Sequence, residues 1–405
     1  MRIIYALLSP TFGMHQYTAD YANRLATGIA TVSLTTTTVA SAAPYMAHIP
    51  VHTPVSTSDT GFNQIALCGA LRLGVGREIA GCTLSAETFA AADVVHFSGP
   101  HLWNLPLLLH LRRAGIPTLH TLHDVAPHPG YGVRYSAALY LWNRLVAHAA
   151  THILVHGQRY KARVARWIGE ERVTCIPLLH GFWGTQFSPD RVQPPPRNRQ
   201  LLTSRTHPSG QDLPFALYFG RIEAYKGVDI LVQSYVQAYH SQGRLRPSGG
   251  MLDSNRGTTK PPRLVIAGKG ALSLIWNGPL PSGVEVRNRH IEDEEALDLF
   301  RRCAVVVLPY RKATQSALIA AAYVFCKPVI VTATGALSEY VLAGKTGWIV
   351  PPLDSGTLAQ ALDEALVNPA ETRRRGVAGR AWYEAQRGEE WDALQRLYQR
   401  VANAL

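Results

Sequence analysis

Short apolar runs alternate with helix-period patterns along the first half of the chain. Apolar residues recur at helical spacing from Tyr17 to Leu25, behind a predicted glycine turn at Thr11 to Met14. Further helices are predicted at Leu105 to Ala114 and Ser136 to His148. Buried strands are predicted at four apolar runs: Arg2 to Leu8, Asp93 to Phe97, Thr118 to Leu122 and Ile153 to His156. This alternation is typical of a parallel sheet with crossover helices.

The same alternation begins again in the second half. Strands are predicted at Leu217 to Phe219, Leu264 to Ala267, Val305 to Leu308 and Val329 to Thr332. Helices are predicted at Val228 to Tyr239, Glu294 to Arg301, Ala317 to Val324 and Ser355 to Leu366. The pattern therefore predicts an α/β fold with two doubly wound, Rossmann-like domains that face each other across a cleft. Ligands are expected at the carboxyl ends of the strands.

Composition divides the chain into four parts. The first domain is expected at residues 1–185, and a linker rich in proline and arginine at 186–212. The second domain is expected at 213–370, followed by a helical tail at 371–405 for which a return to the first domain is left open. Residues 30–85 show no clear period, and residues 242–262 are predicted to be a mobile basic loop.

Charge and cysteine content limit the function classes. The net charge of +12 favours anionic partners. Nucleic acid is a poor fit, because the basic residues show no aromatic–basic platform. The five cysteines are far apart and match neither a disulfide framework nor metal-ligand spacing. No apolar run is long enough to span a bilayer, and Met1 to Leu8 is read as a strand rather than a signal peptide. A cytoplasmic protein is expected.

The stretch from Ala216 to Asp229 is the first candidate site. An apolar run ends at Gly220, and a helix pattern begins just after Gly227. A strand, a glycine turn and a helix start place backbone N–H groups where an anion can bind. Arg221 and Lys226 add two cations, which suits a diphosphate. The alternative is an ordinary strand-to-helix turn with solvated charges.

This stretch contains the first of several sequence blocks that occur in a fixed order. They are Phe219 to Gly227, Leu264 to Gly270, Val307 to Tyr310 with Ala313 to Ser316, Lys327 to Ile330, and Gly335 to Tyr340 with Gly344 to Trp348 and Pro351. In the first half, Gly13, Val94 to His96 and Leu119 to Asp124 add a thinner set. Together these blocks resemble the GT-B glycosyltransferases, specifically the retaining family 4 (glycosyl transferases group 1).

The resemblance implies an enzyme that transfers a sugar, expected to be a hexose, from a nucleoside-diphosphate sugar. It implies retention at the anomeric carbon and neither a metal nor another cofactor. Arg221 and Lys226 would hold the diphosphate and stabilise its charge as it leaves. The remaining donor contacts implied are the glycines Gly13, Gly220 and Gly268, the cation Arg311, and, at the base, Asn288, His290 and Ile291.

The chain departs from the family pattern at two positions. Members commonly carry two glutamates where Ala313 and Ala321 stand here. Their absence leaves open a rival function, a non-catalytic nucleotide-binding paralogue or the partner subunit of an active enzyme. Thr314-Gln315-Ser316 lies at a predicted helix start and resembles a branch of the family. Ser316 could bind phosphate and Gln315 the sugar, or Thr314 and Ser316 could simply cap the helix.

Polar residues cluster after the strand at Thr118 to Leu122. His120, His123, Asp124 and His128 follow within nine residues, and a zinc site is a rival to a substrate site here. By resemblance, His123 would position the donor sugar or the acceptor. Asp124, and His15 behind the first strand, would contact the acceptor, although His15 fits equally well as a residue at a helix start.

The segment from Arg159 to Ile168 combines basic residues with an apolar stripe. Such a helix could lie on an anionic membrane, which would suit a lipid-linked acceptor in polysaccharide or glycolipid assembly. The alternative is an amphipathic helix that packs on the core and exposes its arginines. The partners expected are thus a nucleotide sugar, a glycan or lipid-linked acceptor, and the inner face of a membrane as an open possibility.

Overall fold

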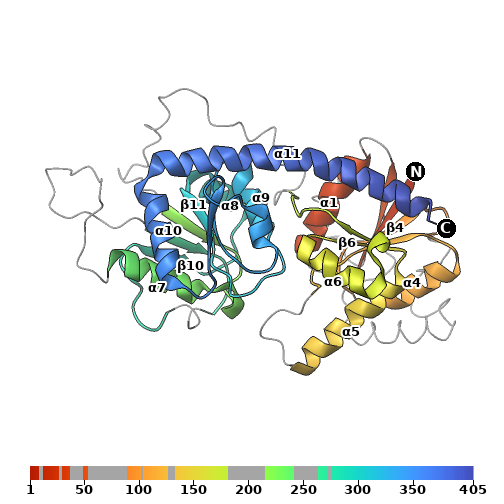
Figure 1. The fold of residues 1–405 in the computed structure, drawn as a ribbon, viewed down its shortest axis with the longest axis horizontal. Helices are drawn as coiled ribbons and strands as arrows, with labels where there is room; N and C mark the ends of the chain where they lie inside the picture. The colour runs from red at the N-terminus through yellow and green to blue at the C-terminus, as the bar shows by residue number, and fades with distance from the viewer. Residues whose placement is uncertain are drawn as a thin grey trace. The chain divides into compact units, whose positions relative to one another are not determined.

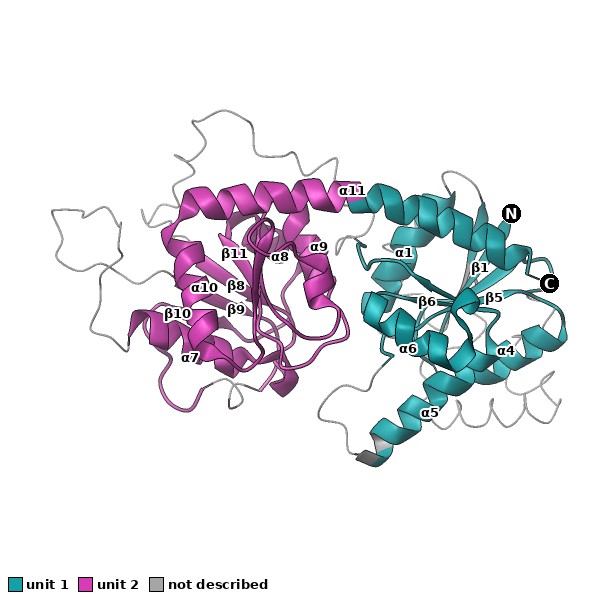
Figure 2. Cartoon of the chain, in the orientation of Figure 1, with its two compact units in different colours: residues 1–127, 131–188, 386–405 teal, residues 128–130, 189–385 magenta. Residues whose placement is uncertain are grey.

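The chain folds into two compact units. Unit 1 comprises residues 1–127, 131–188 and 386–405, and unit 2 comprises residues 128–130 and 189–385 (Figure 2). The structure is a computed structural model that describes residues 1–8, 12–26, 30–36, 49–52, 89–101, 104–125, 133–180, 215–240, 263–271, 273 and 276–404. The predicted linker and the predicted basic loop lie outside the described residues.

Unit 1 is built on a seven-stranded sheet in the order β3-β2-β1-β4-β5-β6-β7, with every pair parallel. The strands are β1 (Arg2–Leu7), β2 (Thr31–Thr36), β3 (Val51–His52), β4 (Val94–Phe97), β5 (Thr118–Thr121), β6 (His152–Val155) and β7 (Val173–Cys175). The central strands β4, β5 and β6 are buried along their whole length. Strand order reverses between β1 and β4, so the carboxyl ends of these two strands mark the position where such sheets bind ligands.

The helices of unit 1 cover both faces of this sheet. α1 (Phe12–Ala26) follows β1, whereas α4 (Asn104–Arg113), α5 (Val133–Ala149) and α6 (Gln158–Ile168) connect the strands from β4 to β7, with the short η1 (Glu170–Arg172) before β7. Because parallel crossovers are right-handed, the two directions of winding place α1 on one face and the other three on the opposite face. Figure 1 shows α4, α5 and α6 together on one side of the sheet.

Unit 2 is built on a six-stranded parallel sheet in the order β10-β9-β8-β11-β12-β13. Its strands are β8 (Phe215–Phe219), β9 (Arg263–Ala267), β10 (Val284–Arg287), β11 (Val305–Leu308), β12 (Val329–Thr332) and β13 (Gly347–Val350). Its helices are α7 (Val228–Tyr239), α8 (Asp293–Arg302), α9 (Leu318–Val324) and α10 (Ser355–Val367), with the short turns η4 (Ala224–Lys226) and η6 (Leu337–Tyr340). Here the order reverses between β8 and β11.

The last helix, α11 (Pro369–Ala402), contributes to both units. In unit 2 it packs closely on α9, where a Cβ at Gly379 would lie 2.4 Å from the Tyr323 ring. In unit 1, Arg387 forms a bidentate ion pair with Asp20, with both N–O distances 2.9 Å. The fully buried Glu390 accepts hydrogen bonds from Arg24 (2.9 Å) and Arg387 (2.6 Å). These contacts fix the final turns of the chain on α1.

The observed architecture confirms the predicted α/β fold, with two parallel-sheet units. Five strands were not among the predicted elements, namely β2, β3, β7, β10 and β13. They lie away from the centre of their sheets, and β10 is only half-buried throughout, so the apolar signal is weak there. The predicted glycine turn is wrong at Gly13, because α1 already begins at Phe12 and Gly13 has room for a side chain.

Candidate functional site

Two glycines shape the loops that follow β8 and β9. The Gly220 N–H donates to the Ala267 carbonyl at 2.9 Å. Gly220 and Gly268 have φ values of 126° and 144°, which side chains rarely tolerate. A Cβ at Gly268 would lie only 2.0 Å from the Gly220 carbonyl oxygen. Glycine at this position therefore lets two backbone segments run in contact beside the strand ends.

The loop after β8 also meets the loop after β11, across the point where strand order reverses. The Arg311 N–H donates to the Tyr225 carbonyl at 2.8 Å. Gly227 adopts a left-handed φ of 64° just before α7, and a Cβ there would lie 2.1 Å from the Pro309 oxygen. Both loops are thus held against each other at the position where open parallel sheets bind their ligands.

Lys226 is the central cation of this loop cluster. Its Nζ lies 5.1 Å from the ring centroid of Tyr310 and 5.9 Å from that of Tyr225. No carboxylate of the described residues pairs with it, whereas Arg221 is exposed and pairs with Glu223 at 2.9 Å. A Cβ at Gly220 would lie 3.3 Å from Nζ, so the glycine leaves room for the ammonium group. Lys226 is held by aromatic faces and can accept an anion.

The other expected donor residues near this cluster are engaged in structural contacts. Arg311 forms an ion pair with Asp229 in the first turn of α7. Thr314 is buried, and its carbonyl accepts from the Ala336 N–H at 2.9 Å. The Ser316 hydroxyl accepts from the Leu318 N–H at 3.4 Å, at the beginning of α9. The N-cap of α9 is Ala317 and accepts no hydrogen bond through its side chain, and Gln315 is half-exposed.

The three residues expected at the base lie after β10. The Asn288 side-chain oxygen accepts from the Gly270 N–H at 2.9 Å, which ties the loop after β10 to the loop after β9. His290 is exposed and Ile291 is buried. β9 lies between β10 and β8 in the unit 2 sheet. Because the three strands are parallel, the loops after β8, β9 and β10 all leave the sheet at its carboxyl end.

In unit 1, His123 lies beside the reversal of strand order. It follows β5, and its Nε2 lies 3.1 Å from the carbonyl oxygen of Ser98, the first residue after β4. A carbonyl can only accept, so Nε2 carries the proton and Nδ1 is a hydrogen-bond acceptor in the neutral ring. The ring lies 4.9 Å from that of His156 and 4.6 Å, edge to face, from that of Tyr17.

His123 belongs to a group of buried histidines. Burial lowers the pKa of His156 and His180 to about 4 and that of His120 to about 3. Burial also lowers the pKa of His123 well below its usual value, with further lowering from neighbouring histidines. The members of this group, called the histidine cluster below, are His96, His120, His123, His156 and His180. They are uncharged at neutral pH.

Hydrogen bonds connect the histidine cluster to α11. His96 lies between the Tyr398 hydroxyl (2.6 Å, to Nδ1) and the Thr121 hydroxyl (2.8 Å, to Nε2). The Tyr398 hydroxyl also bonds that of Tyr5 at 2.6 Å, and the Thr121 hydroxyl lies 3.3 Å from that of Tyr17. The last helix of the chain thus helps to position the layer of side chains on which His123 packs.

The expected acceptor residues differ in exposure. His15 is fully buried in α1. Asp124 is half-buried, and its backbone carbonyl accepts from the Asn143 side chain at 2.8 Å. His128 lies outside the described residues. Within the described part of the chain, no group of three or more His, Cys, Asp or Glu side chains could hold a metal ion.

Several residues of this region were missed by the sequence reasoning. Tyr17, His96, His156, His180 and Tyr398 were not singled out. A usable signal was present for His156, because the predicted strand Ile153 to His156 ends on it. Tyr398 carried no signal at all, since its partners are about 300 or more positions away along the chain.

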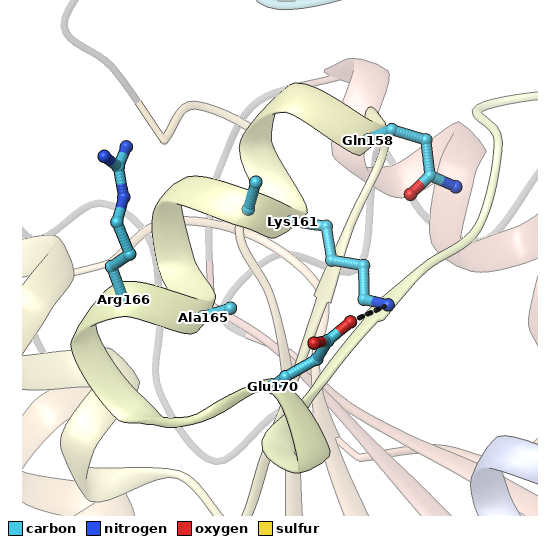
Figure 3. Close-up of a pocket in the computed structure, with 6 residues that line it drawn as sticks. Gln158, Lys161, Ala165, Arg166 and Glu170 are labelled. Carbon is cyan, nitrogen blue, oxygen red and sulfur yellow. Dashed lines mark hydrogen bonds and ion pairs between the residues drawn. The ribbon is translucent and has the colours of Figure 1, made fainter.

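A separate pocket of about 490 Å³ lies on α6, and none of the predicted donor or acceptor residues lines it. Its lining consists of Gln158, Lys161, Ala162, Ala165, Arg166 and Glu170. Figure 3 shows Lys161 directed at Glu170, with an N–O distance of 3.0 Å, and Arg166 pointing away from this pair. Among the described helices, none is long and apolar enough to cross a membrane.

Comparisons with known proteins decide the family. Residues 214–368 match the sequence pattern of the glycosyl transferases group 1, and residues 12–178 match that of the glycosyl transferase 4-like domain. The two matches cover most of the chain, each within one unit. The chain belongs to the GT-B glycosyltransferases. The predicted resemblance to the GT-B glycosyltransferases is confirmed.

Two relatives with assigned activities match the chain at low identity. A D-inositol 3-phosphate glycosyltransferase from Streptomyces avermitilis is 24% identical over 305 residues, which are 71% of this chain and 60% of the relative. The enzyme of the same name from Streptomyces scabiei is 23% identical over 403 residues, covering 92% of this chain and 82% of the relative. The chain therefore spans less than two thirds of the first relative.

Solved structures support the same fold at low identity. The Anabaena protein HepE in complex with UDP aligns with a TM-score of 0.67 at 15% identity, covering 99% of this chain and all of HepE. Sucrose-phosphate synthase from Thermosynechococcus elongatus aligns with a TM-score of 0.67 at 18% identity over the full length of both chains. These likenesses establish the GT-B architecture of the chain.

Proposed function

We propose that this glycosyltransferase moves a sugar from a nucleoside-diphosphate sugar to a hydroxyl of a glycan or lipid-linked acceptor, with retention and without a metal. The observation that carries the proposal is the placement of Lys226. Its ammonium lies over two aromatic rings, beside Gly220 and the start of α7, at the carboxyl end of β8. A cation held in this way, next to a helix N-terminus, suits a diphosphate.

The chemistry assigns a role to each cation. The bond between the anomeric carbon and the phosphate oxygen breaks, and the acceptor oxygen forms a new bond on the same face of the sugar. The proton of the acceptor hydroxyl passes to the departing phosphate oxygen, so the leaving group is a nucleoside diphosphate. Lys226 stabilises the charge that develops on this group, because it is already in place before the bond breaks. Arg221 adds a second cation once it exchanges Glu223 for phosphate.

His123 is proposed to position the sugar or the acceptor hydroxyl. Its burial keeps the ring neutral, and its Nε2–H is committed to the Ser98 carbonyl. A neutral ring with Nδ1 as acceptor can receive a hydrogen bond from a hydroxyl. Asp124, the next residue, is proposed to contact the acceptor. A general base is not required, because the leaving phosphate oxygen takes the proton.

A UDP sugar is the first donor to test, since HepE structures contain UDP and UDP-glucose. A thermal-shift panel of UDP-, GDP-, ADP- and TDP-sugars should show one donor that raises the melting temperature. The same donor should then release its nucleoside diphosphate in the presence of acceptor. Arg221→Ala and Lys226→Ala should each reduce the release about 10²-fold or more. A panel in which no donor binds would contradict the proposal.

A second candidate function is a nucleotide-binding subunit without its own activity. Ala313 and Ala321 motivate it, because members of this family commonly carry carboxylates there. Ala321 is fully buried in α9. The two functions separate cleanly in one experiment, since the non-catalytic protein would bind a nucleotide but release no diphosphate with any acceptor extract.

A further inference from the structure

Positive charge is concentrated in one stretch of unit 1. Residues 94–169 contain eight lysines and arginines but a single acidic residue, Asp124. This stretch therefore holds seven of the chain's twelve excess positive charges. It includes three complete helices, α4, α5 and α6, which contain no acidic residue at all. A solvated helix layer usually mixes both signs of charge, so the bias requires an explanation.

The three helices form one continuous layer on the same side of the unit 1 sheet (Figure 2). The Arg112 guanidinium of α4 donates to the carbonyl of His148 in α5 at 3.2 Å. The rings of Tyr140 in α5 and Trp167 in α6 meet edge to face, 5.3 Å apart. The basic residues of all three helices therefore belong to one surface.

This layer also exposes large apolar side chains. On α5, Leu141 is 58% exposed and Leu145, one turn later, is 44% exposed. Tyr140 beside them and Leu109 on α4 are exposed as well. A single exposed leucine needs no explanation. Two exposed leucines one helical turn apart, among basic helices that contain no acidic residue, do need one. We call Leu109, Tyr140, Leu141 and Leu145, with the exposed Arg113 and Arg144, the α4–α5 face.

The apolar stripe of α6 is not part of this surface. Tyr160, Val164 and Ile168 are buried, so the stripe predicted from the sequence packs on the core. What α6 adds is charge, because Arg166 extends away from the Lys161–Glu170 pair (Figure 3). α6 is therefore an amphipathic helix that packs on the core. Apolar side chains that enter a bilayer must come from α5 and α4.

We infer that the α4–α5 face docks on an anionic lipid bilayer. Leucines that protrude from a helix can enter the acyl boundary, while arginines around them bind lipid phosphates. The uniform charge favours a lipid surface over a second copy of this chain, whose identical face would repel it. This inference goes beyond the proposed transfer reaction and does not depend on it.

Vesicle sedimentation without any sugar nucleotide tests the inference. The full chain should sediment with phosphatidylglycerol-containing vesicles and much less with pure phosphatidylcholine vesicles. The L141S/L145S variant should bind the anionic vesicles about tenfold more weakly, because two leucines no longer insert. The matched control is L342S/L353S in unit 2, whose leucines are 45% and 58% exposed and should leave binding unchanged. Equal binding by both variants would overturn the inference.

Charge is tested separately. R113Q/R144Q should weaken binding to anionic vesicles about 25-fold, since each of the two arginines near the surface contributes roughly a fivefold gain. Arg301→Gln on α8, an exposed arginine outside the face, should have little effect. Sedimentation velocity without vesicles tests the alternative that a second copy of this chain occupies the α4–α5 face. If L141S/L145S lowers the mass of a wild-type dimer while vesicle binding stays the same, the face is an interface between copies and the inference fails.

Discussion

The loop cluster of unit 2 and the histidine cluster of unit 1 lie at equivalent positions of their sheets but are built in opposite ways. In unit 2, charged side chains stand at the surface over a backbone shaped by glycines. In unit 1, the ionisable side chains are buried and uncharged, and His96 is held by hydrogen bonds to Tyr398 and Thr121. The difference indicates a division of labour, in which one unit neutralises anionic charge and the other positions neutral hydroxyl groups.

The anchoring of α11 on unit 1 gives the largest expected effect. Replacing Glu390 by alanine leaves Arg24 and Arg387 without their shared buried carboxylate. The loss should lower the free energy of unfolding by about 3–5 kcal/mol. Urea unfolding monitored by fluorescence would measure it. Glu384→Ala is the matched control on the same helix, because the ion pair that Glu384 forms with Arg380 is more exposed. Similar losses in both variants would contradict a special role for the buried network.

The next largest effect is expected from the loss of Lys226, the cation of the unit 2 loop cluster. Lys226→Ala should reduce nucleoside diphosphate release about 10²-fold or more, since it removes charge stabilisation of the leaving group. Lys226→Arg should recover part of the activity. Lys345→Ala, an exposed lysine in the same unit, serves as the control. An unchanged rate in Lys226→Ala would show that the loop cluster does not act on the donor.

The histidine cluster predicts a dependence of stability on pH. Folded-state pKa values near 4 for His156 and His180, and near 3 for His120, lie below the unfolded value near 6.5. Their contribution is fully present above pH 6.5 and is lost as the pH falls toward 4, because the unfolded chain binds more protons. Within that window, each histidine should lower the free energy of unfolding by about 1.4 kcal/mol for each unit by which the pH falls. Urea unfolding of the wild type and His156→Gln at several pH values would check this.

In that comparison the variant should show a shallower slope than the wild type. A free energy of unfolding that stays constant between pH 6.5 and pH 5 would mean that the cluster is hydrated and titrates normally.

The smallest effect concerns the link between α11 and the cluster. Tyr398→Phe removes the hydroxyl that bonds both His96 and Tyr5. Stability should fall by about 1–2 kcal/mol, because two buried polar groups lose a partner. Tyr140→Phe, which alters an exposed tyrosine on α5, is the control. The same loss in both variants would argue against the hydrogen-bonded link.

The sequence was a good guide to one of these regions and a poor guide to the other. The unit 2 cluster arises from residues 219–227 and neighbouring loops, so its glycines and cations appear as local motifs. Even so, the ion pair between Arg311 and Asp229 could not be foreseen, because the two residues are 82 positions apart. In unit 1, His123 was found beside its strand. Its support by His96 and Tyr398 depends on chain folding that no local pattern encodes.

The apolar pattern also predicted some secondary-structure elements better than others. Central strands such as β8 and β11 are continuous apolar runs because both faces are covered. Outer strands such as β10, with Glu285 and Arg287, mix polar and apolar residues. The apolar stripe of α6 correctly indicated a helix. It could not show whether the stripe faced the core or a membrane, because both environments select the same residues.

Calorimetric titration of UDP, followed by GDP, ADP and TDP, into the wild type and Lys226→Ala tests the central claim most directly. The account predicts that one nucleoside diphosphate binds the wild type and binds Lys226→Ala at least tenfold more weakly. The melting temperature of the free variant should stay unchanged, and Lys345→Ala should bind like the wild type. Equal dissociation constants for the wild type and Lys226→Ala would contradict the claim that this loop holds the diphosphate.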